Sequence, residues 1–145
     1  MFSYILFDLD GTVSDPKAGI TGSVQYALHA LGIEEPDLDR LEPFIGPPLR
    51  DSFQEYYNLN EEQTEFAVKK YRERFCAKGI YENILYPGMK ELLNRLKESG
   101  CHLAVASSKL EVSVTEILRY FAIGDCFEVT VGSEPDGTRS KKEEV

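Results

Sequence analysis

The stretch Tyr4-Ile-Leu-Phe-Asp-Leu-Asp-Gly-Thr12 is the clearest indication of the fold class. Its first four residues are apolar without alternation, which predicts a strand buried on both faces, as in a parallel sheet. Two carboxylates, Asp8 and Asp10, follow directly and are two positions apart, so at strand spacing both point to the same side. Open α/β sheets place their ligands at the carboxyl ends of the strands. This stretch therefore predicts a first strand that ends in a ligand site.

Strands and helices alternate in the rest of the chain. Further apolar strands are predicted at 102–106 and 127–131. Apolar residues recur at helical spacing in three segments, 20–31, 89–96 and 110–121. Strands that alternate with helices indicate an α/β fold with a parallel, doubly wound, Rossmann-like sheet.

A long helical block interrupts this alternation after the first strand. It holds a proline-rich stretch at 34–50 and a helix that begins after Asn60, where Asn60 and Gln63 have the spacing of a capping box. The predicted domains are therefore a core of residues 1–15 and 87–145 and an inserted helical subdomain of residues 16–86. Because doubly wound sheets usually carry about five strands, we expect the core to be incomplete at its C-terminus.

Composition limits the classes of partner. Lys and Arg number 16 and Asp and Glu 25, so the formal net charge is −9. This balance argues against binding a nucleic acid polymer or an anionic membrane surface, because both need clustered cations. No stretch approaches the roughly 18–20 apolar residues of a membrane helix. The three cysteines form no Cys-x-x-Cys pair and predict reduced thiols, buried as apolar filler, in a cytoplasmic protein.

The two carboxylates after the first strand suit catalysis. Close carboxylates repel each other unless a cation lies between them or one keeps a proton. A hard cation such as Mg²⁺ takes oxygen ligands, and a protonated aspartate can act as a general acid. The alternative is a plain strand-ending turn, since Asp-Gly is common in turns. We favour the chemical interpretation because both acids follow a fully apolar run.

The segment Phe7-Asp-Leu-Asp-Gly-Thr-Val13 resembles the first motif of the haloacid dehalogenase superfamily, in its phosphatase branch. The resemblance implies that Asp8 is the nucleophile and Asp10 the general acid and base. It also implies a Mg²⁺ cofactor whose ligands are Asp8 and Asp10, the latter through its backbone carbonyl. Dehalogenases lack the second aspartate, so its presence favours phosphoryl transfer.

Ser107 follows the second predicted strand, in the sequence Val105-Ala-Ser-Ser-Lys109. A hydroxyl and backbone N–H groups ahead of a helix suit a phosphate, although a plain N-cap serine is the alternative. The superfamily's second motif is a Thr or Ser at this point, so the resemblance makes Ser107 and Ser108 phosphate-binding. Lys109 completes the Ser-Ser-Lys pattern, or it is a solvated cation at the helix start.

The later motifs of the superfamily are a lysine and a pair of acids. Lys142 fits the lysine better than Lys141 and would balance phosphate charge; a solvated charge run is the alternative. The pair of acids is not found: Gly124-Asp125 resembles its start, but lies before the third strand instead of after it.

The helical insertion resembles the superfamily's cap, which closes over the site. In Phe44-Ile-Gly-Pro-Pro-Leu-Arg-Asp-Ser-Phe53, Arg50 could bind an anionic substrate as a fork-shaped donor. The alternative is a salt bridge with a nearby acid. The combined motifs look most like the 5′-nucleotidase-like phosphatases, which are close to phosphoglycolate phosphatases.

The expected function is therefore Mg²⁺-dependent hydrolysis of a small phosphorylated metabolite or nucleotide through an aspartyl-phosphate. Alternatives are a phosphoglycolate phosphatase, a phosphomutase, or a catalytically inert binding module that lacks the last acids. We expect a monomer or a homodimer. Residues 4–7 would offer an unpaired apolar edge, and exposed strand edges pair with other chains. We therefore expect either additional residues of the protein or association with another chain to cover this edge.

Overall fold

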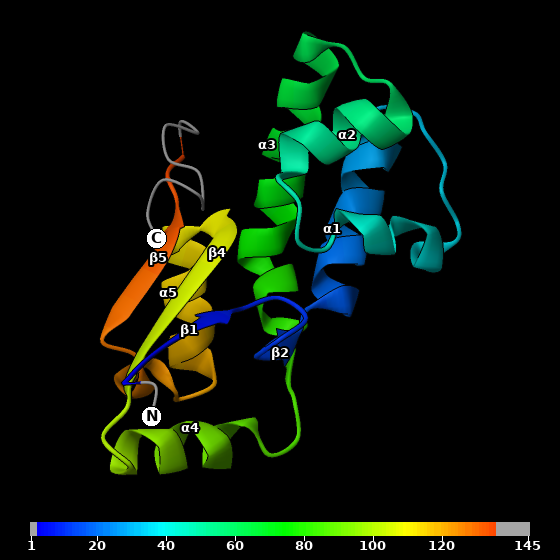
Figure 1. Ribbon diagram of the computed structural model, residues 1–145. Coiled ribbons are helices and arrows are strands. Elements are labelled where there is room, and N and C mark those ends of the chain that lie inside the picture. Colours follow the sequence, from blue (N-terminus) through cyan, green and yellow to red (C-terminus); the bar gives the residue numbers. More distant parts are fainter. Residues whose placement is uncertain (1–2, 136–145) are drawn as a thin grey trace. The chain divides into compact units, whose positions relative to one another are not determined.

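The computed structural model describes residues 3–135, and the chain divides into two compact units (Figure 1). The first unit joins the N-terminal residues up to Asp15 to those from Ile84 onward, and the second is Pro16–Asn83. The sequence placed the second boundary after Tyr86. A short antiparallel pair, which the sequence did not reveal, joins β2 (Ser14–Asp15) to β3 (Ile84–Leu85) and explains why the first unit begins again at Ile84.

A parallel sheet forms the centre of the first unit. Its strands, in the spatial order β1-β4-β5, are β1 (Tyr4–Asp8), β4 (His102–Leu110) and β5 (Val129–Ser133). The helices between them are α4 (Met89–Glu98) and α5 (Glu111–Tyr120). The predicted α/β fold with a parallel sheet and a helical insertion is confirmed. The last strand begins later than predicted, because the 3₁₀ turn η3 (Gly124–Cys126) precedes it and pairing with β4 starts at Val129.

One face of this sheet is exposed. Leu103 and Val105 of β4 are buried, whereas Leu6 and Val129, which are in register with Ala104 between them, are 50% and 53% exposed. Both crossovers run in the same direction along the sheet, and right-handed connections then place α4 and α5 on the same face. The expectation that the first strand is buried on both faces is therefore wrong for the part of the chain that the structure describes.

The second unit is helical. Its elements are α1 (Lys17–Ala30), η1 (Leu38–Phe44), α2 (Leu49–Tyr57), α3 (Glu61–Ala77) and η2 (Gly79–Tyr81). Helices α1 and α3 lie side by side (Figure 1). The predicted capping box is confirmed: the Asn60 side chain accepts from the Gln63 N–H at 2.9 Å, and the Gln63 side chain accepts from the Asn60 N–H at 3.0 Å. No helix between residues 3 and 135 is long and apolar enough to cross a membrane.

The cysteines are free thiols in different environments. Cys126 is buried, as expected of apolar filler, but Cys76 is exposed near the end of α3. The filler interpretation is wrong for Cys76, because the preceding residue, Phe75, takes the buried side of the helix.

The buried carboxylate of Glu35 contacts residues of both η1 and α2 in the second unit. Glu35 is only 9% exposed and accepts hydrogen bonds from the Tyr57 hydroxyl at 3.2 Å and the Asp37 N–H at 3.3 Å. Arg40 lies 3.7 Å from the same carboxylate. Burial, followed by the hydrogen bond to Glu35, raises the pKa of Tyr57 to about 12.

The raised Tyr57 pKa predicts a loss of stability at alkaline pH. The folded state favours the neutral phenol, so the contribution of Tyr57 is complete below its ordinary pKa of about 10 and is lost as the pH rises toward 12. We expect Tyr57→Phe to lower the urea midpoint at about pH 8 and to have a smaller effect at about pH 11. An equal difference in midpoint at both pH values would contradict this assignment.

Candidate active site

The carboxyl ends of β1 and β4 bring the first predicted site residues to one edge of the sheet. Asp8 is the last residue of β1 and is in register with Ala106 of β4. Ser107 directly follows Ala106 and is 4% exposed. Because neighbouring parallel strands end at the same edge, Asp8 and Ser107 lie on adjacent strands at this edge.

A tight loop after β1 positions Asp10. The N–H groups of Thr12 and Val13 donate to the Leu9 carbonyl at 3.2 and 2.9 Å, and the Gly11 N–H donates to the Ser14 carbonyl at 2.8 Å. Leu9 and Val13 are fully buried and anchor the loop in the core. The Asp-Gly turn is therefore real, and it holds the Asp10 side chain largely buried, at 9% exposed.

Lys109 forms an ion pair with Asp10, at 3.2 Å between Nζ and Oδ2. The Lys109 side chain is also only 9% exposed, so its interpretation as a solvated cation at the helix start is wrong. The other carboxylate oxygen of Asp10, Oδ1, is buried and has no hydrogen-bond partner among the described residues. Sequence reasoning missed this pair; its only signal was the lysine in the Ser-Ser-Lys pattern.

An irregularity in β4 places Lys109. Pairing with β5 shifts register between Ala106 and Leu110, and the Lys109 N–H donates to Ser107 Oγ at 3.1 Å. Helix α5 begins only at Glu111, so Ser107 lies within the extended strand and not at the N-cap. Phosphate binding by Ser107 and by the half-buried Ser108 stays a prediction.

Gly132 of β5 allows the close approach that this irregularity needs. A Cβ at this position would lie 2.4 Å from the Glu111 Cα and 2.7 Å from the Lys109 carbonyl oxygen. Both contacts are with backbone, which cannot rotate out of the way.

We therefore expect Gly132→Ala to shift the junction of β4 and α5 and to lower the free energy of unfolding by about 2 kcal/mol. Urea unfolding of this variant would measure the loss. Gly124→Ala is the matched control, because a Cβ there meets nothing within 4 Å. Equal stability of the two variants would refute the close approach.

The site has oxygen donors that suit a divalent cation. Asp8 supplies a carboxylate at the strand end, and the first motif implies that Asp10 would add its backbone carbonyl oxygen. Mg²⁺ usually binds through one or two carboxylates, with water and substrate phosphate as the other ligands. The two aspartates fit that pattern, and the described residues supply no group of three or more His, Cys, Asp or Glu side chains for a metal.

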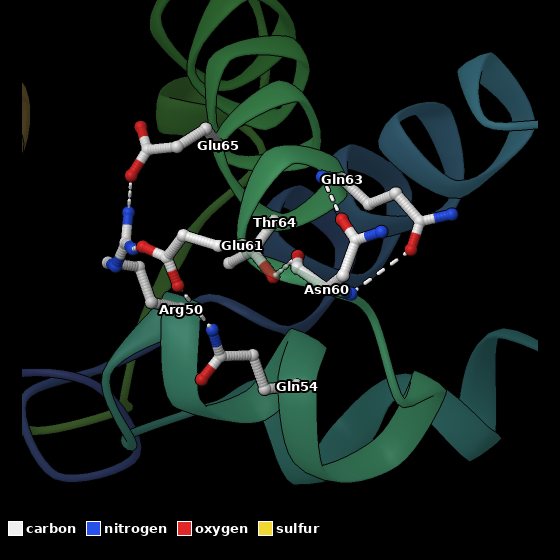
Figure 2. A network of polar contacts seen from close by, with 7 residues as sticks. All are labelled: Arg50, Gln54, Asn60, Glu61, Gln63, Thr64 and Glu65. Carbon is white, nitrogen blue, oxygen red and sulfur yellow. Dashed lines mark hydrogen bonds and ion pairs between the residues drawn. The ribbon is translucent and has the colours of Figure 1, made fainter.

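Arg50 lies at the start of α2 in the helical unit and is ion-paired (Figure 2). Its guanidinium contacts the carboxylates of Glu61 and Glu65 on α3, and Gln54 donates to Glu61 at 3.1 Å. This is the salt-bridge alternative that the sequence left open. A role for Arg50 in binding an anionic substrate stays a prediction.

Lys142 and Gly124-Asp125 are the two other sequence features that resemble motifs of the superfamily. Lys142 is outside the described residues. Asp125 lies in η3, at the amino end of β5, where its carbonyl accepts from Lys97 at 2.7 Å. The amino end of a parallel strand is opposite the ligand-binding edge, so Gly124-Asp125 does not supply the missing acids.

Comparison with known proteins identifies the family. The sequence profile of the haloacid dehalogenase-like hydrolases matches residues 5–142. A solved structure described as a predicted phosphatase from Clostridium acetobutylicum superposes with a TM-score of 0.95 at 47% identity, covering 99% of this chain and 67% of that one. The chain therefore belongs to the haloacid dehalogenase-like hydrolase family, as the first motif predicted.

Curated relatives with different names match the chain. A Pseudomonas aeruginosa protein named 5′-nucleotidase is 54% identical over 97% of this chain. The tyrosine-protein kinase PtkA of Mycobacterium tuberculosis is 38% identical over 97% of it, and an Aquifex aeolicus phosphoglycolate phosphatase is 31% identical over 93% of it. The chain spans 64%, 48% and 62% of these relatives, respectively.

Proposed function

We propose that this chain carries the catalytic centre of a Mg²⁺-dependent hydrolase of small phosphate monoesters. The observation that carries the proposal is the placement of Asp8 and the largely buried Asp10 at the carboxyl end of β1, beside Ser107 of β4. Membership of the haloacid dehalogenase-like hydrolases supports it. The first motif assigns nucleophilic attack to Asp8 and proton transfer to Asp10.

The reaction would begin with attack on phosphorus. A carboxylate oxygen of Asp8 forms a bond to phosphorus as the bond between phosphorus and the alcohol oxygen breaks. The protonated form of Asp10 gives its proton to the departing alcohol oxygen, which lowers the barrier because a neutral alcohol leaves more easily than an alkoxide. The products of this step are an aspartyl-phosphate at Asp8 and an ionised Asp10.

Water completes the cycle. Asp10, now a carboxylate, accepts a proton from a water molecule that attacks the phosphorus of the aspartyl-phosphate. The bond between phosphorus and the Asp8 oxygen breaks, which releases phosphate and restores both side chains. Ser107 and Ser108 would bind the phosphoryl oxygens, and Lys142 would balance their charge. Mg²⁺ held by Asp8 and Asp10 would supply charge neutralisation for the same oxygens.

A nucleoside 5′-monophosphate is the substrate class that we propose first, because the 5′-nucleotidase of Pseudomonas aeruginosa is 54% identical. The test is phosphate release from a panel of nucleoside monophosphates, 2-phosphoglycolate and 4-nitrophenyl phosphate, each with Mg²⁺ and with EDTA. We expect Mg²⁺-dependent turnover, with a nucleotide preferred. Preference for 2-phosphoglycolate would select the phosphoglycolate phosphatase alternative, whose support is the relative at 31% identity.

A catalytically inert binding module remains the alternative from another class. The observation that favours it is that the described residues supply no group of three or more His, Cys, Asp or Glu side chains that could hold a metal ion. Phosphate binding without release in the same panel would select it. Transfer of phosphate between sugar phosphates, without release, would select a phosphomutase.

The exposed sheet face predicts association of this chain with itself. Tyr4, Leu6 and Val129 contribute to a shallow apolar groove on that face, and Tyr4 is 78% exposed. We expect light scattering after size exclusion to report a dimer or larger species, and Leu6→Lys to shift it toward the monomer. A monomer of the unaltered chain at high concentration would contradict this expectation.

A further inference from the structure

Lys109 and Asp10 form a largely buried ion pair at the site. The Lys109 ammonium lies 3.2 Å from Asp10 Oδ2, and both side chains are 9% exposed. Exposed ion pairs contribute little to stability, whereas breaking a buried pair leaves an uncompensated charge and is strongly destabilising. The position of Lys109 is therefore coupled to that of Asp10.

The contact constrains one carboxylate oxygen and not the other. Oδ2 is held by the ammonium, while Oδ1 is buried and has no hydrogen-bond partner among the described residues. Buried polar atoms almost always have a partner, so a buried oxygen without one needs a structural explanation. With Oδ2 held, the carboxylate plane of Asp10 cannot turn freely about its last side-chain bond.

Contacts of the β4 backbone place the Lys109 ammonium beside Asp10. The register shift between Ala106 and Leu110 and the bond from the Lys109 N–H to Ser107 Oγ fix the backbone at Lys109. Gly132 lets β5 approach the Lys109 carbonyl without a clash. Three separate features of β4 and β5 thus place one lysine against the loop that carries Asp10.

We propose that Lys109 is a positioning residue, which holds Asp10 Oδ2 and thereby fixes the orientation of the carboxyl group that transfers the proton. This inference rests on the proposed function, because it assigns Lys109 the task of orienting the proton-transfer group. Lys109 itself need not contact the substrate. Its loss should impair the protonation of a leaving group more than it impairs attack by Asp8.

A double-mutant cycle, measured by thermal unfolding, tests the contact between Lys109 and Asp10 without any assay of activity. We expect Lys109→Met to lower Tm by about 5 °C in the unaltered chain and by less than half as much when Asn replaces Asp10. Lys97→Met is the matched control, because it makes the same chemical change at an exposed position. Lys97 lies in α4 and donates to the Asp125 carbonyl. Equal Tm losses from Lys109→Met in both backgrounds would overturn the proposed contact.

Leaving-group dependence tests the positioning role. A 4-nitrophenolate leaves readily, whereas an alkyl phosphate needs a proton on its leaving oxygen. We expect Lys109→Met to lower kcat/KM about a hundredfold for an alkyl phosphate. For 4-nitrophenyl phosphate we expect a loss of only about tenfold. Asp10→Asn should show the same bias, and Lys109→Arg, which keeps the charge, should recover part of the activity on the alkyl phosphate.

The outcomes separate this inference from the proposed function. Equal losses on both substrates, or no recovery with arginine, would show a general structural role and overturn the positioning role. A chain that turns over neither substrate would overturn the proposed function instead. In that case the Tm cycle still decides whether Lys109 holds Asp10.

Discussion

Asp8→Asn is expected to abolish phosphate release, with a loss in kcat of at least about a thousandfold. The amide keeps the shape of the side chain but is a poor nucleophile, so no phosphoryl-enzyme can form. Asp8 ends β1 and is in register with β4, so the substitution leaves the strand pairing in place. Release from 4-nitrophenyl phosphate, followed by absorbance, measures the effect.

The matched control for this experiment is Asp125→Asn. Asp125 is exposed in η3, and its known contact is through its backbone carbonyl. We expect this variant to retain activity. Full turnover by Asp8→Asn would remove the nucleophile from the mechanism, and equal losses in the two variants would indicate a nonspecific effect of lost charge.

Gly19→Ala is expected to destabilise the helical unit severely, by about 3 kcal/mol. Gly19 lies in the first turn of α1, and its N–H donates to the Glu82 carbonyl at 3.1 Å. A Cβ at this position would lie 2.0 Å from the Gly79 carbonyl oxygen and 3.1 Å from the Glu82 carbonyl oxygen. These atoms are backbone, so α1 and η2 must separate to admit a methyl group.

Gly22 provides the control on the same helix. A Cβ there would meet the guanidinium of Arg74, with its nearest atom at 3.0 Å, and that side chain can shift. We expect Gly22→Ala to change the urea midpoint by much less than Gly19→Ala does. Helix propensity favours alanine over glycine at both positions, so midpoints that fall equally would contradict the contact with the Gly79 backbone as the cause of the loss.

The regular elements of the fold were largely readable from local patterns. Apolar runs predicted the three strands, and the Asn60-Glu-Glu-Gln63 signature predicted the start of α3. Such signals depend on residues close in sequence, so they can be interpreted without knowledge of the tertiary structure. The sequence does not predict helix α2, because the helix begins directly after Gly-Pro-Pro, where the prolines indicate a broken chain.

Features that depend on distant partners were not readable. The two-residue strands β2 and β3 are too short to carry a hydrophobic pattern, and only their pairing defines them. The exposure of Leu6 was also hidden, because an apolar run does not reveal which face a helix will cover.

The candidate site shows the same difference between local sequence patterns and contacts of distant residues. Asp8 and Asp10 were found from their spacing after an apolar strand, which is a local signal. The ion pair between Asp10 and Lys109 joins residues nearly a hundred positions apart and depends on the register of β1 with β4 and on the irregularity in β4. No pattern in one sequence encodes that register.

The most direct test of the proposed nucleophile is to detect a phosphoryl group covalently bound to the protein. The chain would be incubated with 4-nitrophenyl phosphate and Mg²⁺, quenched in acid, digested and analysed by mass spectrometry. We predict that the mass of one phosphoryl group appears on the N-terminal peptide and maps to Asp8. Turnover without label at Asp8, or label on another residue such as Ser107, would contradict the central claim that the aspartate at the end of β1 is the nucleophile.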